Sequence, residues 1–325
     1  MQKYPQVSVI IPVYNVSKYI QQCCISLFGQ TLDNVEFIFV DDSSTDDSVK
    51  IIKDVLSYFP NRISQVKILS NKVNMGVSYS RQIGIDNSIG EYIIHCDPDD
   101  WVELDAYESL YALAKETNSD IVGCDYIKEY VNKSVVCSEN IVNEKYAVIS
   151  SIMSDGNIKG FLWNRLVKRQ LLVEHGICFY TGLSLWEDMS VVIPLHIVAH
   201  KVNYLPKVLY HYRKTNYESI GTNLSVSKVE SSIKATEYVE LFLRRSNTLE
   251  LLELPLKMMQ LNSKKSFLFD SRVYNPNKWF NTFKSANKYI CKSNLRFDLK
   301  FIMCLAKFQI FFPAKLRLKL KTIIK

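Results

Sequence analysis

A short run of carboxylates, Asp97-Pro98-Asp99-Asp100, directly follows an apolar segment of the chain. Carboxylates this close repel one another unless a cation or a basic group offsets their charge. Their hard oxygen atoms suit Mg²⁺ or Mn²⁺, which proteins commonly bind through one or two carboxylates together with substrate phosphates. The alternative is a solvated acidic turn ahead of Trp101, and the run alone does not separate the two interpretations.

A second polar cluster extends from Asp41 to Asp47 and also follows an apolar segment. Asp and Ser are common in turns and at helix N-caps, and this is the interpretation we favour for Asp46 and Asp47. Asp41 and Asp42 come earlier, at the end of a predicted strand. There they are well placed to accept hydrogen bonds from a base or a ribose.

The elements that must position these clusters alternate between strand and helix. Short apolar runs predict buried strands, and amphipathic stretches between them predict helices. This alternation is typical of an α/β fold with a mainly parallel sheet flanked by helices. Ligands of such sheets lie outside the carboxyl ends of the strands. The polar residues at three strand ends should therefore converge on one edge of the sheet: Pro12 to Tyr14, Asp41-Asp42 and Asp97 to Asp100.

The pattern becomes less regular beyond about residue 150. We expect a helix starting at Trp163 to Leu166, a helix over residues 186–199 and a strand over 208–213. Beyond residue 223 the sequence is helical and increasingly basic. The predicted organisation is a catalytic domain over 1–222 and a helical extension over 223–325. The first domain would comprise a nucleotide-sugar-binding half, 5–125, and an acceptor-side half, 126–222.

Composition places the chain among ordinary globular proteins. Of its 325 residues 47% are hydrophobic and 22% are charged, which allows a packed core and argues against disorder. The eight cysteines show no CxxC spacing, so we expect free thiols. The N-terminal sequence MQKYPQ has no signal-peptide pattern, and no apolar run reaches 18 residues. We therefore expect a cytoplasmic protein without a transmembrane helix.

The charge is distributed unevenly along the chain. The net charge is +7, but residues 257–325 alone carry +14 and the remainder carries −7. A basic tail on an acidic body indicates an anionic surface as the partner of the tail, and does not indicate a nucleic acid. Apolar residues alternate with the basic ones, as in a helix lying on the inner face of the cell membrane. A helical subdomain packed on the catalytic core is the alternative.

Four motifs, taken in their order, make the pattern specific. The chain resembles the family 2 glycosyltransferases of the GT-A fold in Pro12 to Asn15, Val40 to Asp46, Asn74 to Ser78 and Asp97 to Trp101. Residues 163–169 and 186–188 also resemble segments of the family. The resemblance covers about residues 5–220 and fades beyond them.

The resemblance implies a reaction. An inverting transferase would move a sugar from a nucleotide-diphosphate donor, expected to be a UDP-sugar, to a hydroxyl of a glycan or a lipid-linked acceptor. Cell-surface polysaccharide synthesis is the expected setting, and Mg²⁺ or Mn²⁺ is the implied cofactor. The middle residue of the DxD motif is Pro98, where the family more often has Ser or Ala, but both carboxylates are kept.

The resemblance also implies roles for residues that match its motifs. Asp97 would face the ribose or the metal, and Asp99 would be the direct metal ligand. The other implied donor contacts are Pro12 and Tyr14 at the nucleobase, Asp41 at its polar edge, and Asn74 and Arg81 near the nucleotide and its phosphates.

On the acceptor side, Glu187-Asp188 matches the acidic motif of the family, which makes Asp188 the predicted catalytic base. A helix-surface acid is the alternative for Asp188. Arg213 is predicted to contact phosphate, although an ordinary strand charge is also compatible with its position. His211 could ligate a metal or pack, and we favour packing.

Other functional classes fit the sequence less well. A sugar-nucleotide pyrophosphorylase or a dinucleotide-dependent oxidoreductase needs a Gly-rich loop after the first strand, and Pro12 to Asn15 is no such loop. A degenerate, non-catalytic fold that binds nucleotide sugars or serves as an assembly partner is the remaining alternative. The intact Asp97, Asp99 and Asp188 argue against it.

Overall fold

The computed structural model describes residues 4–139, 144–216 and 224–323. The chain divides into two compact units, which are described separately. Unit 1 comprises residues 1–145, 161–182 and 195–217, and unit 2 comprises residues 146–160, 183–194 and 218–325. The predicted domain boundary between residues 222 and 223 lies outside the described residues.

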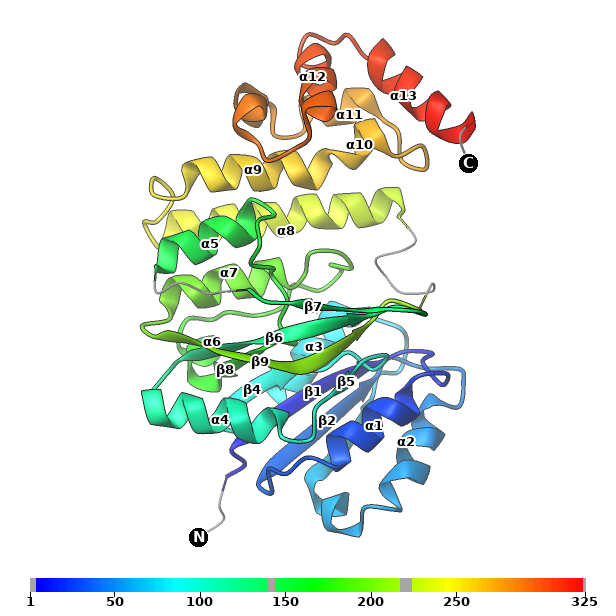
Figure 1. Cartoon of the computed structure of the whole chain (residues 1–325), viewed down its shortest axis with the longest axis vertical. Helices are drawn as coiled ribbons and strands as arrows, with labels where there is room; N and C mark the ends of the chain where they lie inside the picture. Colours follow the sequence, from blue (N-terminus) through cyan, green and yellow to red (C-terminus); the bar gives the residue numbers. More distant parts are fainter. Residues whose placement is uncertain (1–3, 140–143, 217–223, 324–325) are drawn as a thin grey trace. The chain divides into compact units, whose positions relative to one another are not determined.

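Unit 1 is built on a nine-stranded sheet, and half of this sheet is parallel (Figure 1). The parallel half has the order β3-β2-β1-β4, and its central strands β1 and β2 are buried along their whole length. This two-sided burial explains their continuous apolar sequence. The prediction of an α/β fold is confirmed. The strands are β1 (Val7–Val13), β2 (Val35–Asp41), β3 (Val66–Ser70) and β4 (Tyr92–His95).

The other half of the sheet is mixed. Strand β8 (Arg165–Lys168) lies antiparallel between β4 and β6 (Ile121–Glu129), and β9 (Val202–Arg213) runs parallel to β6. The short strands β5 (Trp101–Val102) and β7 (Ser134–Cys137) pair antiparallel with β9 and β6.

The predicted helix at Trp163 to Leu166 is wrong, because Arg165 to Lys168 form strand β8. Arg165, Leu166 and Val167 are all buried, which is the two-sided burial of a central strand. The ion pair of Arg165 with Glu139, at 2.8 Å between Nη2 and Oε2, offsets the cost of burying its charge. A helix, α6 (Arg169–Glu174), begins only after the strand.

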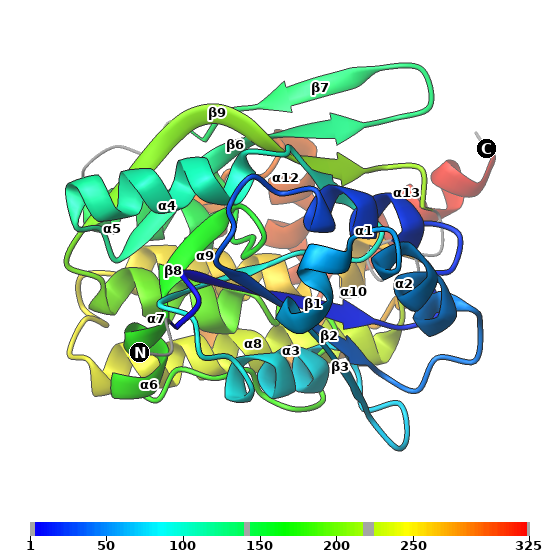
Figure 2. The same ribbon diagram turned by 90° about the horizontal axis from the view of Figure 1, so that it is seen from below.

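Helices cover both faces of the parallel half (Figure 2). On one face, buried residues of α1 such as Cys23 and Leu27 pack in one cluster with Phe37 and Phe39 of β2. On the other face α3 approaches closely, since a Cβ at Gly84 would lie 2.3 Å from Ile10 Cγ2. The helical segments of unit 1 up to α4 are α1 (Ile20–Phe28), α2 (Ser48–Leu56), η1 (Pro60–Gln65), α3 (Val77–Asp86) and α4 (Ala106–Thr117).

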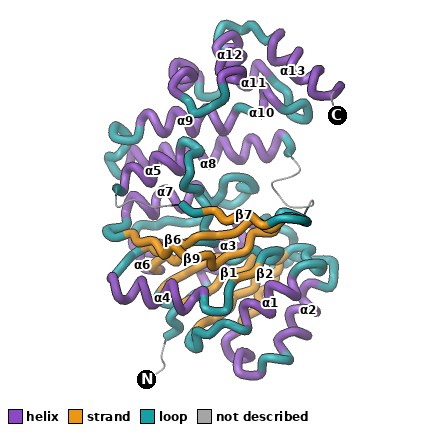
Figure 3. The backbone as a smooth tube through the Cα atoms, in the orientation of Figure 1, coloured by secondary structure: helices purple, strands orange, loops and turns teal. Residues whose placement is uncertain are grey.

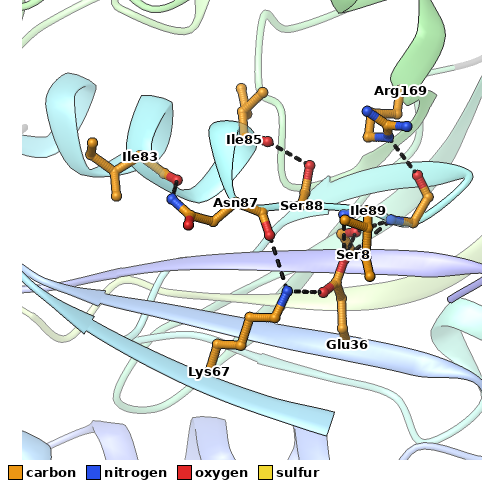
Figure 4. Close-up of polar contacts among 10 residues, drawn as sticks. Ser8, Glu36, Lys67, Ile83, Ile85, Asn87, Ser88, Ile89 and Arg169 are labelled. Atoms are coloured by element: carbon orange, nitrogen blue, oxygen red, sulfur yellow. Dashed lines mark hydrogen bonds and ion pairs between the residues drawn. The ribbon is translucent and has the colours of Figure 1, made fainter. Parts of the chain in front are cut away.

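A buried carboxylate fastens the edge of the sheet where the parallel strands begin (Figure 4). Glu36 Oε1 accepts hydrogen bonds from Ser8 Oγ at 2.5 Å and from the backbone of Ile89 at 2.7 Å and of Gly90 at 3.1 Å. Its Oε2 pairs with Lys67 Nζ at 2.9 Å. Glu36 thus ties β1, β2 and β3 to the turn between α3 and β4, at the edge opposite the predicted ligand site.

In the described residues of unit 2 all regular secondary structure is helical, and loops connect the helices (Figure 3). Its core contains Leu261, Phe267, Trp279 and Met303. The helical extension predicted beyond residue 223 is therefore observed. None of the described helices is long and apolar enough to cross a membrane. Helix α7 (Met189–Val198) begins in unit 2, and its residues 195–198 belong to unit 1. The other helical segments are α5 (Lys145–Met153), α8 (Val226–Arg245), α9 (Glu253–Lys264), α10 (Ser266–Phe269), α11 (Pro276–Asn281), η2 (Lys284–Lys292), α12 (Phe297–Ala306) and α13 (Phe312–Ile323).

The eight cysteines are free thiols, as the sequence predicts. Cys23 and Cys24 lie fully buried on α1, where they pack as small apolar residues. Burial raises the pKa of Cys24, which keeps this thiol protonated at neutral pH.

Candidate active site

The carboxyl ends of β1 and β2 are joined by the first residue after β2. The backbone N–H of Asp42 donates to the carbonyl of Val13 at 2.8 Å. Tyr14 follows β1 with an exposed ring, whereas Pro12 is buried inside the strand opposite Val40. Of the two residues predicted to contact the nucleobase, Tyr14 therefore offers an accessible face at this edge.

Asp41 and Asp42 have different partners. Asp41 Oδ1 accepts a hydrogen bond from the backbone of Ser44 at 3.0 Å, which shapes the turn after β2. Asp42 accepts from the backbone of Met75 at 2.8 Å and of Gly76 at 2.7 Å. Asp42 thereby fastens the loop before α3 to the strand ends. Asn74 directly precedes Met75 in this loop and is exposed.

Arg81 pairs directly with the acidic run. Its Nη2 lies 2.9 Å from Asp97 Oδ1, and the arginine side chain is almost fully buried. The guanidinium also lies over the ring of Phe179, at 5.7 Å from the ring centre. The structure thus joins two residues that the sequence assigned separately to the donor, and Arg81 offsets part of the negative charge of the run.

The neighbours Asp99 and Asp100 differ in their surroundings. Asp100 is fully buried and accepts hydrogen bonds from Tyr210 Oη and the backbone of Arg213, both at 2.7 Å. Asp99 is partly exposed and accepts from Asn216 Nδ2 at 2.8 Å. Asp100 therefore holds the end of β9, whereas Asp99 is available at the edge of the sheet.

Burial raises the pKa of both carboxyls, and neighbouring carboxylates raise it further. For Asp99 the neighbour is Asp97, and the hydrogen bond from Asn216 opposes the shift. For Asp100 the neighbours are Asp99 and Asp97, and the pKa lies well above the usual range. The ionised forms of Asp99 and Asp100 are thus disfavoured in the protein alone, and an added cation would stabilise them.

The side chain of Arg213 makes four contacts beside the same run. Its Nε donates to the Asp99 carbonyl at 2.6 Å, and its Nη2 donates to Gln22 Oε1 at 2.5 Å. Its guanidinium lies over the rings of Tyr19 and Trp101, at 5.3 and 4.7 Å from their centres. Arg213 therefore positions the backbone of Asp99. Its predicted contact with phosphate stays a prediction.

His211 packs, as we favoured from the sequence. Its ring stacks on Trp101 with centres 4.9 Å apart and planes 14° apart. Its Nδ1 lies 2.9 Å from Glu129 Oε1, and its Nε2 lies 2.8 Å from Glu103 Oε1. Both ring nitrogens are engaged by carboxylates, so His211 supports the Trp101 side of the motif.

The donor set around Asp99 fits a hard divalent cation. Within the residues that the structure describes, no three His, Cys, Asp or Glu side chains gather into a ready-made metal cluster. Mg²⁺ and Mn²⁺ do not require one, because substrate phosphates and water complete their coordination. Asp99, with Asp97 beside it, has the carboxylate oxygens that this mode of binding uses.

The predicted acceptor-side acids belong to unit 2. Glu187 and Asp188 are half-buried and directly precede α7, and the carbonyl of Asp188 accepts the backbone N–H of Val192 at 2.8 Å. The backbone of Trp186 has a positive φ of 66°, an uncommon conformation for a bulky residue. The carboxylates of the acidic run belong to unit 1, so the two groups stand on separate compact units.

Several supporting residues were missed by the sequence reasoning. Tyr210 and Asn216 contact the acidic run, and Gln22 contacts Arg213. In each of these pairs the two residues lie far apart along the chain. Only the strand prediction over 208–213 pointed to one of them, Tyr210. A tyrosine in an apolar strand gives no signal that its hydroxyl will meet a buried carboxylate.

Comparisons with known proteins identify similar chains. The family model described as "Glycosyl transferase family 2" matches residues 8–136. A relative, "Putative glycosyltransferase EpsH" of Bacillus subtilis (strain 168), is 31% identical over 253 residues, which span 76% of this chain and 71% of the relative.

Solved structures share the fold at low sequence identity. S. aureus TarS 1–349, in complex with UDP-GlcNAc, superposes with a TM-score of 0.73 at 17% identity and covers 97% of this chain and 90% of its own. The mannosyltransferase PcManGT from Pyrobaculum calidifontis, in complex with GDP-Man and Mn²⁺, has a TM-score of 0.52 at 13% identity, with 98% and 88% of the two chains covered.

Proposed function

Because this chain belongs to the family 2 glycosyltransferases, we propose that it transfers a sugar from a UDP-sugar to a hydroxyl of a glycan or lipid-linked acceptor, with inversion at the anomeric carbon. The observation that carries the donor site is the gathering of Tyr14, Asp41, Asp97 and Asp99 at the carboxyl ends of parallel strands. The TarS complex with UDP-GlcNAc supports a uridine nucleotide as the donor.

The proposed donor site uses the geometry of unit 1. The exposed ring of Tyr14 would stack on the base, and Asp41 would accept a hydrogen bond from its polar edge. Asn74, exposed in the loop that Asp42 fastens, would contact the nucleotide. Arg81 would limit the repulsion between Asp97 and the diphosphate, because it already neutralises that carboxylate.

Asp99 and Asp97 would hold Mg²⁺ or Mn²⁺. When bound, this cation would offset the negative charge that develops on the departing nucleoside diphosphate. The complex of PcManGT with Mn²⁺ supports the choice of ion. Arg213 holds the Asp99 carbonyl through Nε, so this carboxylate would be positioned before the donor arrives.

On the acceptor side, Asp188 would remove the proton from the attacking hydroxyl, with Glu187 beside it. The acceptor oxygen would form a bond to the anomeric carbon while the bond from that carbon to the diphosphate breaks. The diphosphate would leave with the electron pair, and this single displacement inverts the anomeric configuration. We place the reaction in cell-surface polysaccharide synthesis, at the cytoplasmic face of the membrane.

The test is a panel of nucleotide sugars, assayed with Mn²⁺ for hydrolysis and for thermal stabilisation of the protein. We expect a UDP-sugar to stabilise the wild type and Asp188→Asn equally, while Asp188→Asn loses turnover. Asp155→Asn, an exposed carboxylate of the same unit, is the matched control and should keep full activity. Turnover retained by Asp188→Asn would exclude it as the base. A product with retained anomeric configuration, seen by NMR, would exclude the single displacement.

A further inference from the structure

Helix α12 of unit 2 is apolar on two different sides. Its inner residues Ile302, Met303 and Ala306 are buried in the core of the unit. On its outer side, Phe297 is 83% exposed and Phe301 is 56% exposed. A surface helix usually carries polar residues on its outer side, so these exposed phenylalanines indicate that something else covers them.

Further exposed apolar residues follow α12 along the chain. Phe308 lies in the turn that follows α12 and is 71% exposed. In the next helix, α13, Phe312 is 70% exposed and Leu316 follows it one turn later. The two helices pack against each other. We call this set the outer face: Phe297, Phe301, Phe308, Ile310, Phe312 and Leu316.

Basic side chains are interleaved with the outer face. Residues 296–325 contain eight Lys or Arg and a single acid, Asp298, which gives the segment a net charge of +7. Asp298 is itself paired with Arg296 at 3.1 Å and with Arg317 at 3.0 Å. The ammonium of Lys307 lies over the ring of Phe308, at 5.6 Å from its centre. Phenylalanines with lysines beside them match the boundary between acyl chains and anionic headgroups.

The charge also argues against a second copy of this chain as the occupant. A two-fold self-contact would bring two segments of charge +7 together, and their repulsion opposes association. An anionic bilayer has the opposite charge and an apolar layer beneath it. Each Lys or Arg near such a surface adds favourable electrostatic binding energy.

We propose that the outer face docks the protein on an anionic lipid bilayer, with Phe297, Phe301 and Phe308 inserted at the headgroup boundary. Lys300, Lys307 and Lys315 would contact lipid phosphates. The proposal rests on the proposed function in one respect, because docking there would bring the enzyme to the surface that holds a lipid-linked acceptor. The sequence predicted only that the basic tail is attracted to an anionic membrane. The proposal identifies which face binds and which phenylalanines insert.

The experiment is co-sedimentation of the full-length protein with vesicles of phosphatidylcholine, with and without phosphatidylglycerol. We expect binding to the anionic vesicles alone. Phe297→Ser combined with Phe301→Ser should lower the partition coefficient by about 10-fold or more, because two phenylalanines no longer leave water. The matched control is Tyr58→Ser, an equally exposed aromatic of unit 1, which should bind like the wild type.

Three further results decide between the alternatives. Unchanged binding of the double serine variant would overturn the outer face as the docking surface. A change in sedimentation velocity of the free variant, with unchanged vesicle binding, would instead assign the face to self-association and also overturn the proposal. Donor hydrolysis is measured without vesicles in both proteins, so a chain that binds vesicles through this face but hydrolyses no donor would fail the proposed function alone.

Discussion

Asp99 and Asp100 are chemically identical neighbours, but replacing each of them should affect a different property. We expect replacement of Asp100 to lower stability and replacement of Asp99 to abolish activity. Asp100→Ala leaves two buried donors without an acceptor, Tyr210 Oη and the backbone N–H of Arg213. Each such loss costs about 1–3 kcal/mol, so we expect the free energy of unfolding to fall by about 2–6 kcal/mol. Asp99→Ala removes one contact at a partly exposed carboxylate, and we expect a change within about 1 kcal/mol.

Thermal unfolding followed by circular dichroism without added metal measures this difference. At about 2–4 °C per kcal/mol, Asp100→Ala should lower the Tm by several degrees or more, while Asp99→Ala stays near the wild type. Metal-dependent donor hydrolysis should be lost in Asp99→Ala despite its intact fold. Equal Tm values for wild type and Asp100→Ala, or a large fall in Asp99→Ala, would refute this division of roles.

The pH dependence gives the same prediction an independent check. Burial raises the pKa of Asp100 above its ordinary value of 3.8, so the folded state binds this proton more tightly than the unfolded chain. The contribution of Asp100 to stability is therefore greatest in acid and falls as pH rises from 3.8 through the raised folded pKa. In Asp100→Ala this fall in stability with rising pH should be absent. If the variant and the wild type show the same pH profile of unfolding, the pKa of Asp100 is not raised as described.

Three other changes test particular contacts. Glu36→Leu leaves Ser8 Oγ and the backbone N–H of Ile89 without their acceptor, while the N–H of Gly90 keeps its second acceptor, Ser8 Oγ. Urea unfolding should therefore show a loss of about 2–6 kcal/mol, with Glu174→Leu on the surface as the control. Burial lowers the pKa of Lys264 to about 7, so stability should rise between pH 7 and 10 in the wild type, and Lys264→Met should flatten that rise. His211→Phe keeps the stack on Trp101 but loses both carboxylate contacts, and we expect kcat/KM for donor hydrolysis to fall about 10-fold with little change in Tm.

The parallel half of the sheet could be predicted from the sequence because its signals are local. Strands β1 and β2 are buried on both faces, so their residues are almost all apolar, and polar clusters begin where they end. The mixed half gives weaker signals. Strand β8 contains a buried arginine whose charge is compensated by Glu139, 26 residues earlier, and no local pattern predicts that partner.

The same distinction applies to the candidate site. The sequence identifies Asp97 to Asp100 as a group, because a run of carboxylates after a strand is visible in any window. It cannot separate Asp99 from Asp100, because β9 decides which of them is buried. Tyr210 reaches Asp100 from 110 positions away, and Asn216 reaches Asp99 from 117. Such pairings depend on strand order and not on spacing.

The division into two units adds a consequence for the chemistry. The donor carboxylates stand on unit 1 and the predicted base, Asp188, stands on unit 2, so donor binding and proton removal should be separable. A change that loosens unit 2 should reduce transfer to an acceptor while unit 1 still binds the donor. Trp279→Ala, which empties a fully buried site in the core of unit 2, is the sharpest such change. Calorimetry with a UDP-sugar should then show unchanged affinity, and affinity lost in parallel with transfer would show that the donor site needs both units intact.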